Sequence, residues 1–280
     1  MSGWTLVDTH PTSGRTFQRP LDELEVCYLW DGYFNGTSDI LYHYELSLSN
    51  GSQDAHLFSE GNIAKAWLSL KRRFPLAGAT VRGADGAPLQ FEVALDSPRA
   101  HISTGFASEP HFIVQEHNLA IVRPREIVFG GVMGAEDAQR QAVAILHGPR
   151  SLSEELLVQL YVFRETNSER LHVLHLMILI AHCVTDGTAN RTLARCFLDT
   201  LARGAESEPA QIPLEDRLAM ATPSMDHKPV YLRSLSPEIR RWRRAIGMVI
   251  FQLRTEKMQV GVHFLYGLSH TTSLSFLRER

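Results

Sequence analysis

The sequence predicts an α/β fold in which helices pack against a mixed β-sheet. One segment, at residues 63–74, has apolar side chains at the spacing of one helix face. Those side chains are Ile63, Ala66, Trp67, Leu70 and Phe74. A second segment, at residues 171–181, is apolar on both faces, which is typical of a strand in the middle of a sheet with layers on each side. A turn and another amphipathic segment follow that strand, so strands and helices alternate.

The composition is that of a globular protein and excludes several classes. The chain has 280 residues, 44% of them hydrophobic, and a formal charge of −3. This is enough apolar material for one large core or two smaller ones, and it gives no basic field for nucleic acid. No apolar run is long enough to span a membrane, and the first residues lack the features of a secretory signal. The three cysteines form no even disulfide framework. We therefore expect a reduced, cytoplasmic protein without nucleic-acid or membrane partners.

The N-terminal half contains one clear helix between predicted strands. We interpret the first thirty residues as irregular, because prolines and a glycine interrupt them. Residues 37–48 predict a strand that ends at an Asn-Gly turn. The helix at residues 63–74 ends at Pro75, and its lysines and arginines, Lys71 among them, lie largely off the apolar stripe. Residues 79–82 and 88–95, with a turn between them, predict a hairpin.

The C-terminal half predicts a helix, two strands and a further helix. Their ranges are 135–147, 156–163, 171–181 and 188–202. Residues 1–203 then form one half-domain, 204–235 a Pro-rich connection, and 236–280 a helix followed by a tail. Ser236 and Pro237 suit the N-cap and N1 positions of that last helix.

A candidate catalytic segment follows the end of the buried strand. Its sequence is His182-Cys183-Val184-Thr185-Asp186-Gly187. The sheet can hold His182 so that its imidazole, which accepts a proton at neutral pH, is aimed into a cleft. Asp186 can brace the turn by pairing with an arginine or with backbone N–H groups. Gly187 permits the positive φ of a sharp reversal. This arrangement suits the deprotonation of an alcohol, amine or thiol that attacks an activated acyl group.

This segment resembles the HxxxDG motif of the coenzyme A-dependent acyltransferase superfamily. That superfamily includes chloramphenicol acetyltransferase, plant BAHD acyltransferases, fungal trichothecene-type O-acetyltransferases and peptide-synthetase condensation domains. Upstream, residues 67–81 (WLSLKRRFPLAGATV) are similar to the helix, Phe-Pro-x-Ala-Gly and strand near the N-terminus of fungal members. The resemblance spans residues 67–201, and more loosely 19–257.

The resemblance implies a chloramphenicol acetyltransferase-like mixed sheet with flanking helices. His182 would be the general base, Asp186 would be structural and turned toward an arginine, and Gly187 would shape the turn. The reaction would move an acyl group, such as acetyl, from acyl-CoA directly to a hydroxyl of a small secondary metabolite. The co-substrate would be acyl-CoA (acetyl-CoA), and no metal would take part.

The sequence also departs from this family. Large members have two similar halves and a second motif, DFGWG in plant enzymes, which this chain lacks. We therefore expect one half of a two-half architecture, as from a truncated product. A homo-oligomer could complete the site, as in the trimer of chloramphenicol acetyltransferase. The alternatives are an inactive half-domain that acts as a binding module and a condensation-type amide-forming enzyme, which would need an adjoining carrier-protein domain.

Three other features have unremarkable interpretations. His172, His175 and His182 could suggest zinc, but strand parity and distance separate them. Cys183 has the opposite strand parity to the base, which favours a small buried residue over a nucleophile. The arginines around Trp242 could contact the phosphates of coenzyme A or nucleic acid, but an exposed helix face explains them better. They are Arg240, Arg241, Arg243 and Arg244.

Overall fold

The computed structural model describes most of the first 223 residues. The described ranges are 3–10, 14–34, 38–48, 56–93, 104–167, 170–185, 187–203 and 212–223, together with Ser236, Ile239 and Trp242. The contacts divide the chain into two units, Met1–Met225 and Asp226–Arg280. The sheets and helices below belong to the first unit.

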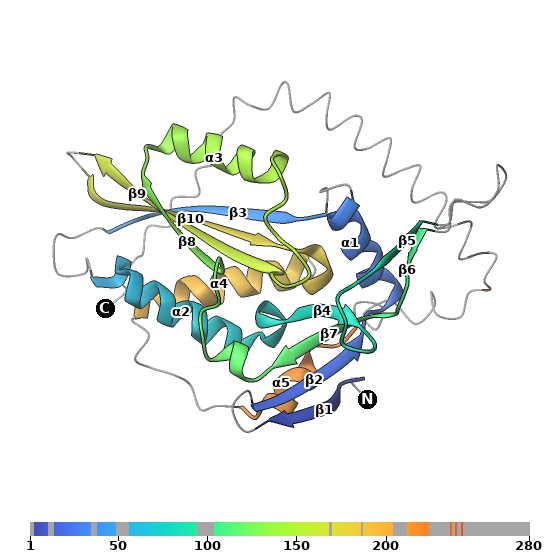
Figure 1. Cartoon of the computed structure of the whole chain (residues 1–280). Helices are drawn as coiled ribbons and strands as arrows, with labels where there is room; N and C mark the ends of the chain where they lie inside the picture. The colour runs from blue at the N-terminus through green and yellow to red at the C-terminus, as the bar shows by residue number, and fades with distance from the viewer. Residues whose placement is uncertain are drawn as a thin grey trace. The chain divides into compact units, whose positions relative to one another are not determined.

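Two four-stranded sheets and five α-helices organise the described part of this unit (Figure 1). The strands are β1 (Thr5–His10), β2 (Gly14–Pro20), β3 (Ile40–Ser47), β4 (Thr80–Gly83), β5 (Phe91–Val93), β6 (Thr104–Phe106), β7 (Pro110–Gln115), β8 (Ile127–Val132), β9 (Val158–Asn167) and β10 (Arg170–Ile180). The helices are α1 (Glu23–Phe34), α2 (Glu60–Arg73), α3 (Ala135–His147), α4 (Gly187–Arg203) and α5 (Leu214–Met220), with short 3-10 turns η2 (Pro75–Gly78), η3 (His117–Leu119) and η4 (His182–Val184).

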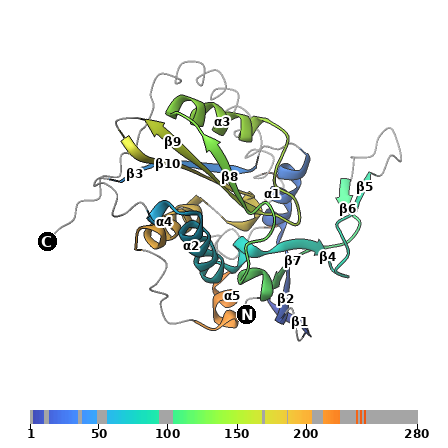
Figure 2. The ribbon, with the colours of Figure 1, turned by 60° about the vertical axis from the view of Figure 1, so that its left-hand side comes forward.

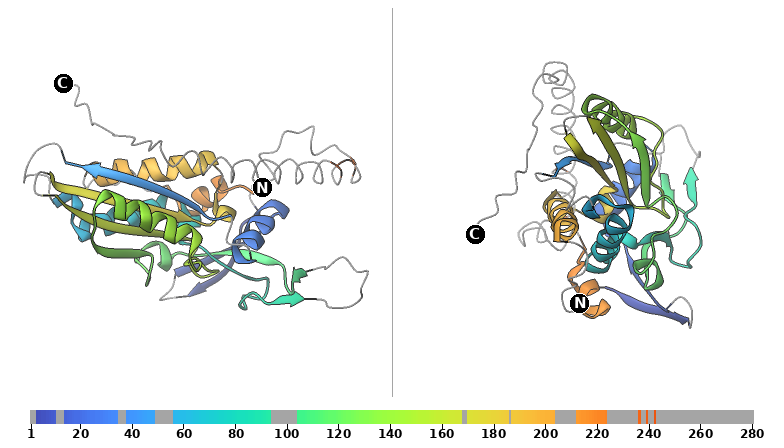
Figure 3. Two further views of the ribbon diagram at one scale, coloured as in Figure 1. Left: turned by 90° about the horizontal axis from the view of Figure 1, so that it is seen from above. Right: turned by 90° about the vertical axis from the view of Figure 1, so that its left-hand side faces the viewer.

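The mixed sheet has the order β3-β10-β9-β8 and contains the predicted central strand. β10 is antiparallel to both of its neighbours, and β8 runs parallel to β9. Helix α3 covers one face of this sheet, and α2 and α4 cover the other (Figures 1 and 3). Apolar side chains from both faces of β10 are therefore buried, as their pattern predicts. These are Val173, Leu174, Leu176, Met177, Ile178, Leu179 and Ile180.

The second sheet is antiparallel, with the order β1-β2-β7-β4 (Figure 2). Phe17 on β2 lies opposite Val114 on β7, and Phe112 lies opposite Val81 on β4. All four side chains are buried, so one face of this sheet joins the core. β5 and β6 form a separate two-stranded sheet.

The predicted helices at residues 63–74, 135–147 and 188–202 are confirmed as α2, α3 and α4. Helix α2 begins after Ser59, whose side chain accepts a hydrogen bond from the Asn62 backbone N–H, and it ends before Pro75. Ile63, Ala66, Trp67 and Leu70 of its predicted apolar stripe are buried, Phe74 is half-buried, and the helix packs against α4. The strands expected at residues 37–48, 156–163 and 171–181 are also confirmed, as β3, β9 and β10.

Two local predictions are wrong. The first thirty residues are not irregular, because β1 and β2 pair as antiparallel strands and α1 follows them. The hairpin expected at residues 79–95 does not form either. β4 pairs with β7 and β5 pairs with β6, since partners far along the chain replace the local one.

The interpretation of Lys71 as an off-stripe cation is also wrong, because its side chain is fully buried. Its ammonium group lies 2.8 Å from both carboxylate oxygens of Glu126 and donates to the carbonyl of Ile121. Trp67 donates to the same carboxylate. Burial lowers the pKa of Lys71 to about 8. The buried face of α2 therefore includes Lys71 as well as the apolar side chains, because the ion pair with Glu126 allows the ammonium group to be buried.

The region around residues 204–235 contains helix α5, whose Leu214 and Leu218 are buried. The predicted domain boundaries at 203 and 235 stay predictions. In the second unit, Ser236 Oγ accepts a hydrogen bond from the Ile239 backbone N–H, as an N-cap does. The rest of that predicted helix, including the arginines around Trp242, and the tail lie outside the described residues. Within the described ranges, the helices are too short or too polar to cross a membrane.

Candidate active site

The candidate site lies where β10 ends and the chain turns into η4. The backbone N–H of Ala181 still donates to the Leu157 carbonyl, at 2.8 Å, so the sheet extends to the residue before His182. The N–H of Val184 then donates to the Ala181 carbonyl and closes a tight turn. His182 is thereby fixed at its backbone by the central strand on one side and by η4 on the other.

The imidazole of His182 is oriented by a carbonyl group. Nδ1 lies 3.0 Å from the carbonyl oxygen of Thr185. Because a carbonyl can only accept a hydrogen bond, this contact assigns the proton of the neutral ring to Nδ1. The lone pair is then on Nε2, which is the arrangement that a general base requires.

The same ring is also held by an aromatic neighbour. Tyr28, on α1, stacks on His182 with ring centroids 3.9 Å apart and an interplanar angle of 8°. Both residues are half-buried, and α1 packs against η4 beside the strand ends (Figure 2). The stack and the Thr185 contact together restrict rotation of the imidazole, so its Nε2 atom has a defined direction.

A half-buried ion pair supports the elements around the site. Arg150 makes two hydrogen bonds to Asp39, Nε to Oδ2 at 2.7 Å and Nη2 to Oδ1 at 3.0 Å. Asp39 precedes β3, and Arg150 precedes β9. Gly32 on α1 lies against this pair, since a Cβ there would be 2.8 Å from Arg150 Nη2. The pair therefore joins the two strands flanking β10 to the helix that carries Tyr28.

Cys183, the neighbour of His182, is buried as predicted. Burial raises the pKa of its thiol to about 12. The thiolate is the nucleophilic form of cysteine, so this thiol is inert at neutral pH. Cys183 is therefore not an activated nucleophile beside His182.

The remaining predicted site residues are only partly described. Gly187 is the first residue of α4. Asp186 lies outside the described residues, so its pairing with an arginine stays a prediction. His175 and His182 do not form a metal site together. Nδ1 of His175 instead lies 3.3 Å from His43 Nε2, and within the described ranges no three His, Cys, Asp or Glu side chains form a group that could hold a metal ion.

The sequence interpretation missed Tyr28 because it missed α1. A signal for this helix was present in the sequence. Asp22 Oδ1 accepts the N–H groups of Leu24 and Glu25, while Glu25 Oε2 accepts the Asp22 N–H, which is a reciprocal capping box. The Asp-x-x-Glu spacing could have located the start of α1, although the stacking partner of His182 is a tertiary contact.

Comparison with known proteins identifies the fold. No protein-family model and no curated protein matches the chain. The TRI3 trichothecene 15-O-acetyltransferase of Fusarium sporotrichioides is similar in structure, with a TM-score of 0.54 and 12% identity over 89% of this chain and 48% of that chain. The condensation domain of the monacolin K polyketide synthase MokA gives a TM-score of 0.46 and 9% identity over 70% of this chain and 36% of that chain. The chain thus spans 48% of the acetyltransferase and 36% of the MokA condensation domain. The structural similarity to the acetyltransferase confirms the predicted fold, a mixed sheet with flanking helices.

Proposed function

We propose that this chain supplies the general base of an acyltransferase, with His182 as that base. The observation that carries the proposal is the contact between His182 Nδ1 and the Thr185 carbonyl, which leaves the lone pair on Nε2. The fold similarity to an O-acetyltransferase supports the same chemistry.

The reaction would transfer an acyl group, such as acetyl, from acyl-CoA to a small alcohol. Nε2 takes the hydroxyl proton as the oxygen attacks the thioester carbonyl. The tetrahedral intermediate then collapses, the C–S bond breaks, and the coenzyme A sulfur leaves and recovers the proton from Nε2. No acyl-enzyme forms on Cys183, whose thiol stays protonated at neutral pH.

Release of coenzyme A from acetyl-CoA in the presence of small alcohols or amines tests this role. His182→Ala should lower the rate about 10²- to 10⁴-fold, the usual contribution of a general base. His147→Ala, at the exposed end of α3, is the matched control and should leave the rate unchanged. Turnover with amines alone would point to the condensation-type alternative. An unchanged rate in His182→Ala would refute the role of His182.

We also propose that copies of this chain form a homo-oligomer that completes the site. The solution mass, measured by light scattering with and without acetyl-CoA, tests this assembly. A stable dimer or trimer is expected. A monomer that neither responds to acetyl-CoA nor turns over would favour the binding-module alternative.

A further inference from the structure

A cavity of about 880 Å³ lies against the antiparallel sheet. Its floor comes from one face of three strands, since Gln18 on β2 lies opposite Ile113 on β7, which lies opposite Thr80 on β4. Residues 123–125 contribute to its wall, together with Ser153, Glu155 and Leu156. Neither His182 nor Tyr28 lines it, so this cavity is separate from the proposed catalytic residues.

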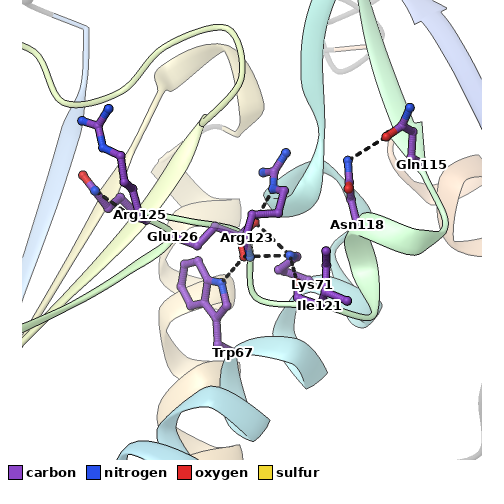
Figure 4. Close-up of polar contacts among 9 residues, drawn as sticks. Trp67, Lys71, Gln115, Asn118, Ile121, Arg123, Arg125 and Glu126 are labelled. Carbon is purple, nitrogen blue, oxygen red and sulfur yellow. Dashed lines mark hydrogen bonds and ion pairs between the residues drawn. The ribbon is translucent and has the colours of Figure 1, made fainter. Parts of the chain in front are cut away.

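The wall of this cavity includes a cation from an unbalanced buried charge cluster. Glu126 is fully buried and binds both Lys71 and Arg123, the latter through Nε at 2.6 Å. Two cations thus share one carboxylate. Figure 4 shows them on different sides of the Glu126 carboxylate. The three side chains carry a net charge of +1 when Lys71 is protonated, as it is at neutral pH.

One nitrogen of that cluster lacks a hydrogen-bond acceptor. Arg123 Nη2 is buried, and within the described ranges no protein atom accepts a hydrogen bond from it. Leaving a buried charged donor unsatisfied is unfavourable, and an oxyanion is the acceptor that a guanidinium group binds best. Arg123 also lines the cavity and its side chain is partly exposed, so a small rotation of the guanidinium group would turn this donor toward a ligand there.

The acidic residues of the cavity already have local partners. Glu155 pairs with Arg82, and Asp85 Oδ1 accepts the Ala87 N–H at 3.0 Å. Asp8 Oδ1 accepts the N–H of Thr9 at 2.7 Å. These contacts direct the carboxylates to their own neighbours, so the excess charge of the Arg123 cluster is not cancelled by a direct contact with them.

We propose that this cavity binds a small organic anion whose phosphate or carboxylate group contacts the guanidinium group of Arg123. The uncharged polar residues of the lining would contact the rest of the molecule, with Gln18, Thr80 and Asn118 among them. The volume lies within the range of about 300–1,000 Å³ that is usual for small-molecule sites.

Calorimetric titration of the full chain with pyrophosphate, with citrate and with uncharged glycerol tests the proposal. Pyrophosphate or citrate should bind, and glycerol should not. Arg123→Gln should weaken that binding about 10- to 100-fold, because it removes a charge-assisted hydrogen bond. Gln18→Glu leaves the Glu126 cluster intact and adds a negative charge to the cavity floor, so it should weaken binding as well. Arg195→Gln, at an exposed position on α4, is the matched loss of charge and should have no effect.

Binding of pyrophosphate alone identifies a phosphate site, and binding of citrate alone identifies a carboxylate site. If Arg123→Gln fails to fold, Gln18→Glu decides the result. The proposal is overturned if neither anion binds the wild-type chain, if glycerol binds as well as the anions, or if the folded cavity variants bind as tightly as Arg195→Gln.

Discussion

The ring of Tyr28 lies almost parallel to the imidazole of His182, with centroids 3.9 Å apart. The two residues are far apart in the sequence and meet because α1 packs against η4. The Thr185 carbonyl fixes the edge of the imidazole, and Tyr28 fixes its face. An imidazole held by two contacts has little rotational freedom left to lose, which is the property that the proposed base requires.

Removing the stack should therefore reduce turnover without removing the base. Tyr28→Ala is expected to lower the rate of coenzyme A release about 2- to 10-fold, because an aromatic pair contributes about 0.5–1.5 kcal/mol. Tyr28→Phe keeps the ring and should retain most of the rate. Equal rates in Tyr28→Ala and the wild type would show that the stack has no role in positioning His182.

Lys71 should be important for stability. Lys71→Ala removes a buried ammonium group and its hydrogen bonds, while Glu126 keeps its pairing with Arg123, so the free energy of unfolding should fall by about 1–3 kcal/mol. Lys65→Ala, at an exposed position of the same helix, should change it by less than about 0.5 kcal/mol. Urea unfolding of both variants measures the difference. Similar losses would contradict the burial of the ion pair.

The three cysteines should differ in reactivity. Cys27 is exposed, whereas Cys183 and Cys196 are buried. A thiol reagent at pH 8 should therefore modify one thiol rapidly in the native protein and all three after unfolding. Mass spectrometry of the native product should locate the label on Cys27. Rapid native labelling of Cys183 would contradict its burial.

Cys183 also makes stability depend on pH. Its pKa is about 12 in the folded chain, against an ordinary value of about 8.5. Between these values the folded state holds a proton that the unfolded state has lost, so stability falls as pH rises, with a slope of up to about 1.4 kcal/mol per pH unit. Cys183→Ala should show a shallower decline between pH 9 and 11. Parallel curves for the two proteins would count against this shift.

Alanine substitutions at two helical glycines, Gly32 and Gly61, should change stability in opposite directions. In Gly32→Ala, the new Cβ would lie 2.8 Å from Arg150 Nη2 and 3.2 Å from Asp39 Oδ1, so we expect a loss of about 1–3 kcal/mol. Gly61 has open space around it, and Gly61→Ala should stabilise α2 by up to about 1 kcal/mol. Thermal unfolding of the two variants compares them, and a stabilised Gly32→Ala would mean that the ion pair can move aside.

The spacing of apolar residues within a segment correctly predicted the helices and strands that are buried along that same spacing. The two-sided apolar pattern of β10 and the stripe of α2 are properties of single segments, and both are confirmed. The partner of β4 is β7, which follows about 27 residues later, and no local turn signal specifies it. The burial of Lys71 likewise depends on Glu126, from a distant loop. Sequence reasoning thus failed where long-range pairing decides the outcome.

In the candidate site, too, local features could be predicted from the sequence, whereas features that depend on contacts formed in the fold could not. The position of His182 at the end of a central strand follows from sequence alone, and so does the burial of Cys183. Its tautomer could not be predicted, because the Thr185 carbonyl reaches Nδ1 only when η4 closes the turn. Tyr28 required α1 to be placed in space.

The most direct test of the central claim is nitrogen NMR of the His182 ring in the wild-type chain, which needs no substrate. His182→Gln identifies the signals by their loss. We expect the neutral ring to carry its proton on Nδ1 and to have an unprotonated Nε2, as the Thr185 contact requires. A neutral ring protonated on Nε2 would contradict the account, because that atom could not then accept the proton of the attacking hydroxyl.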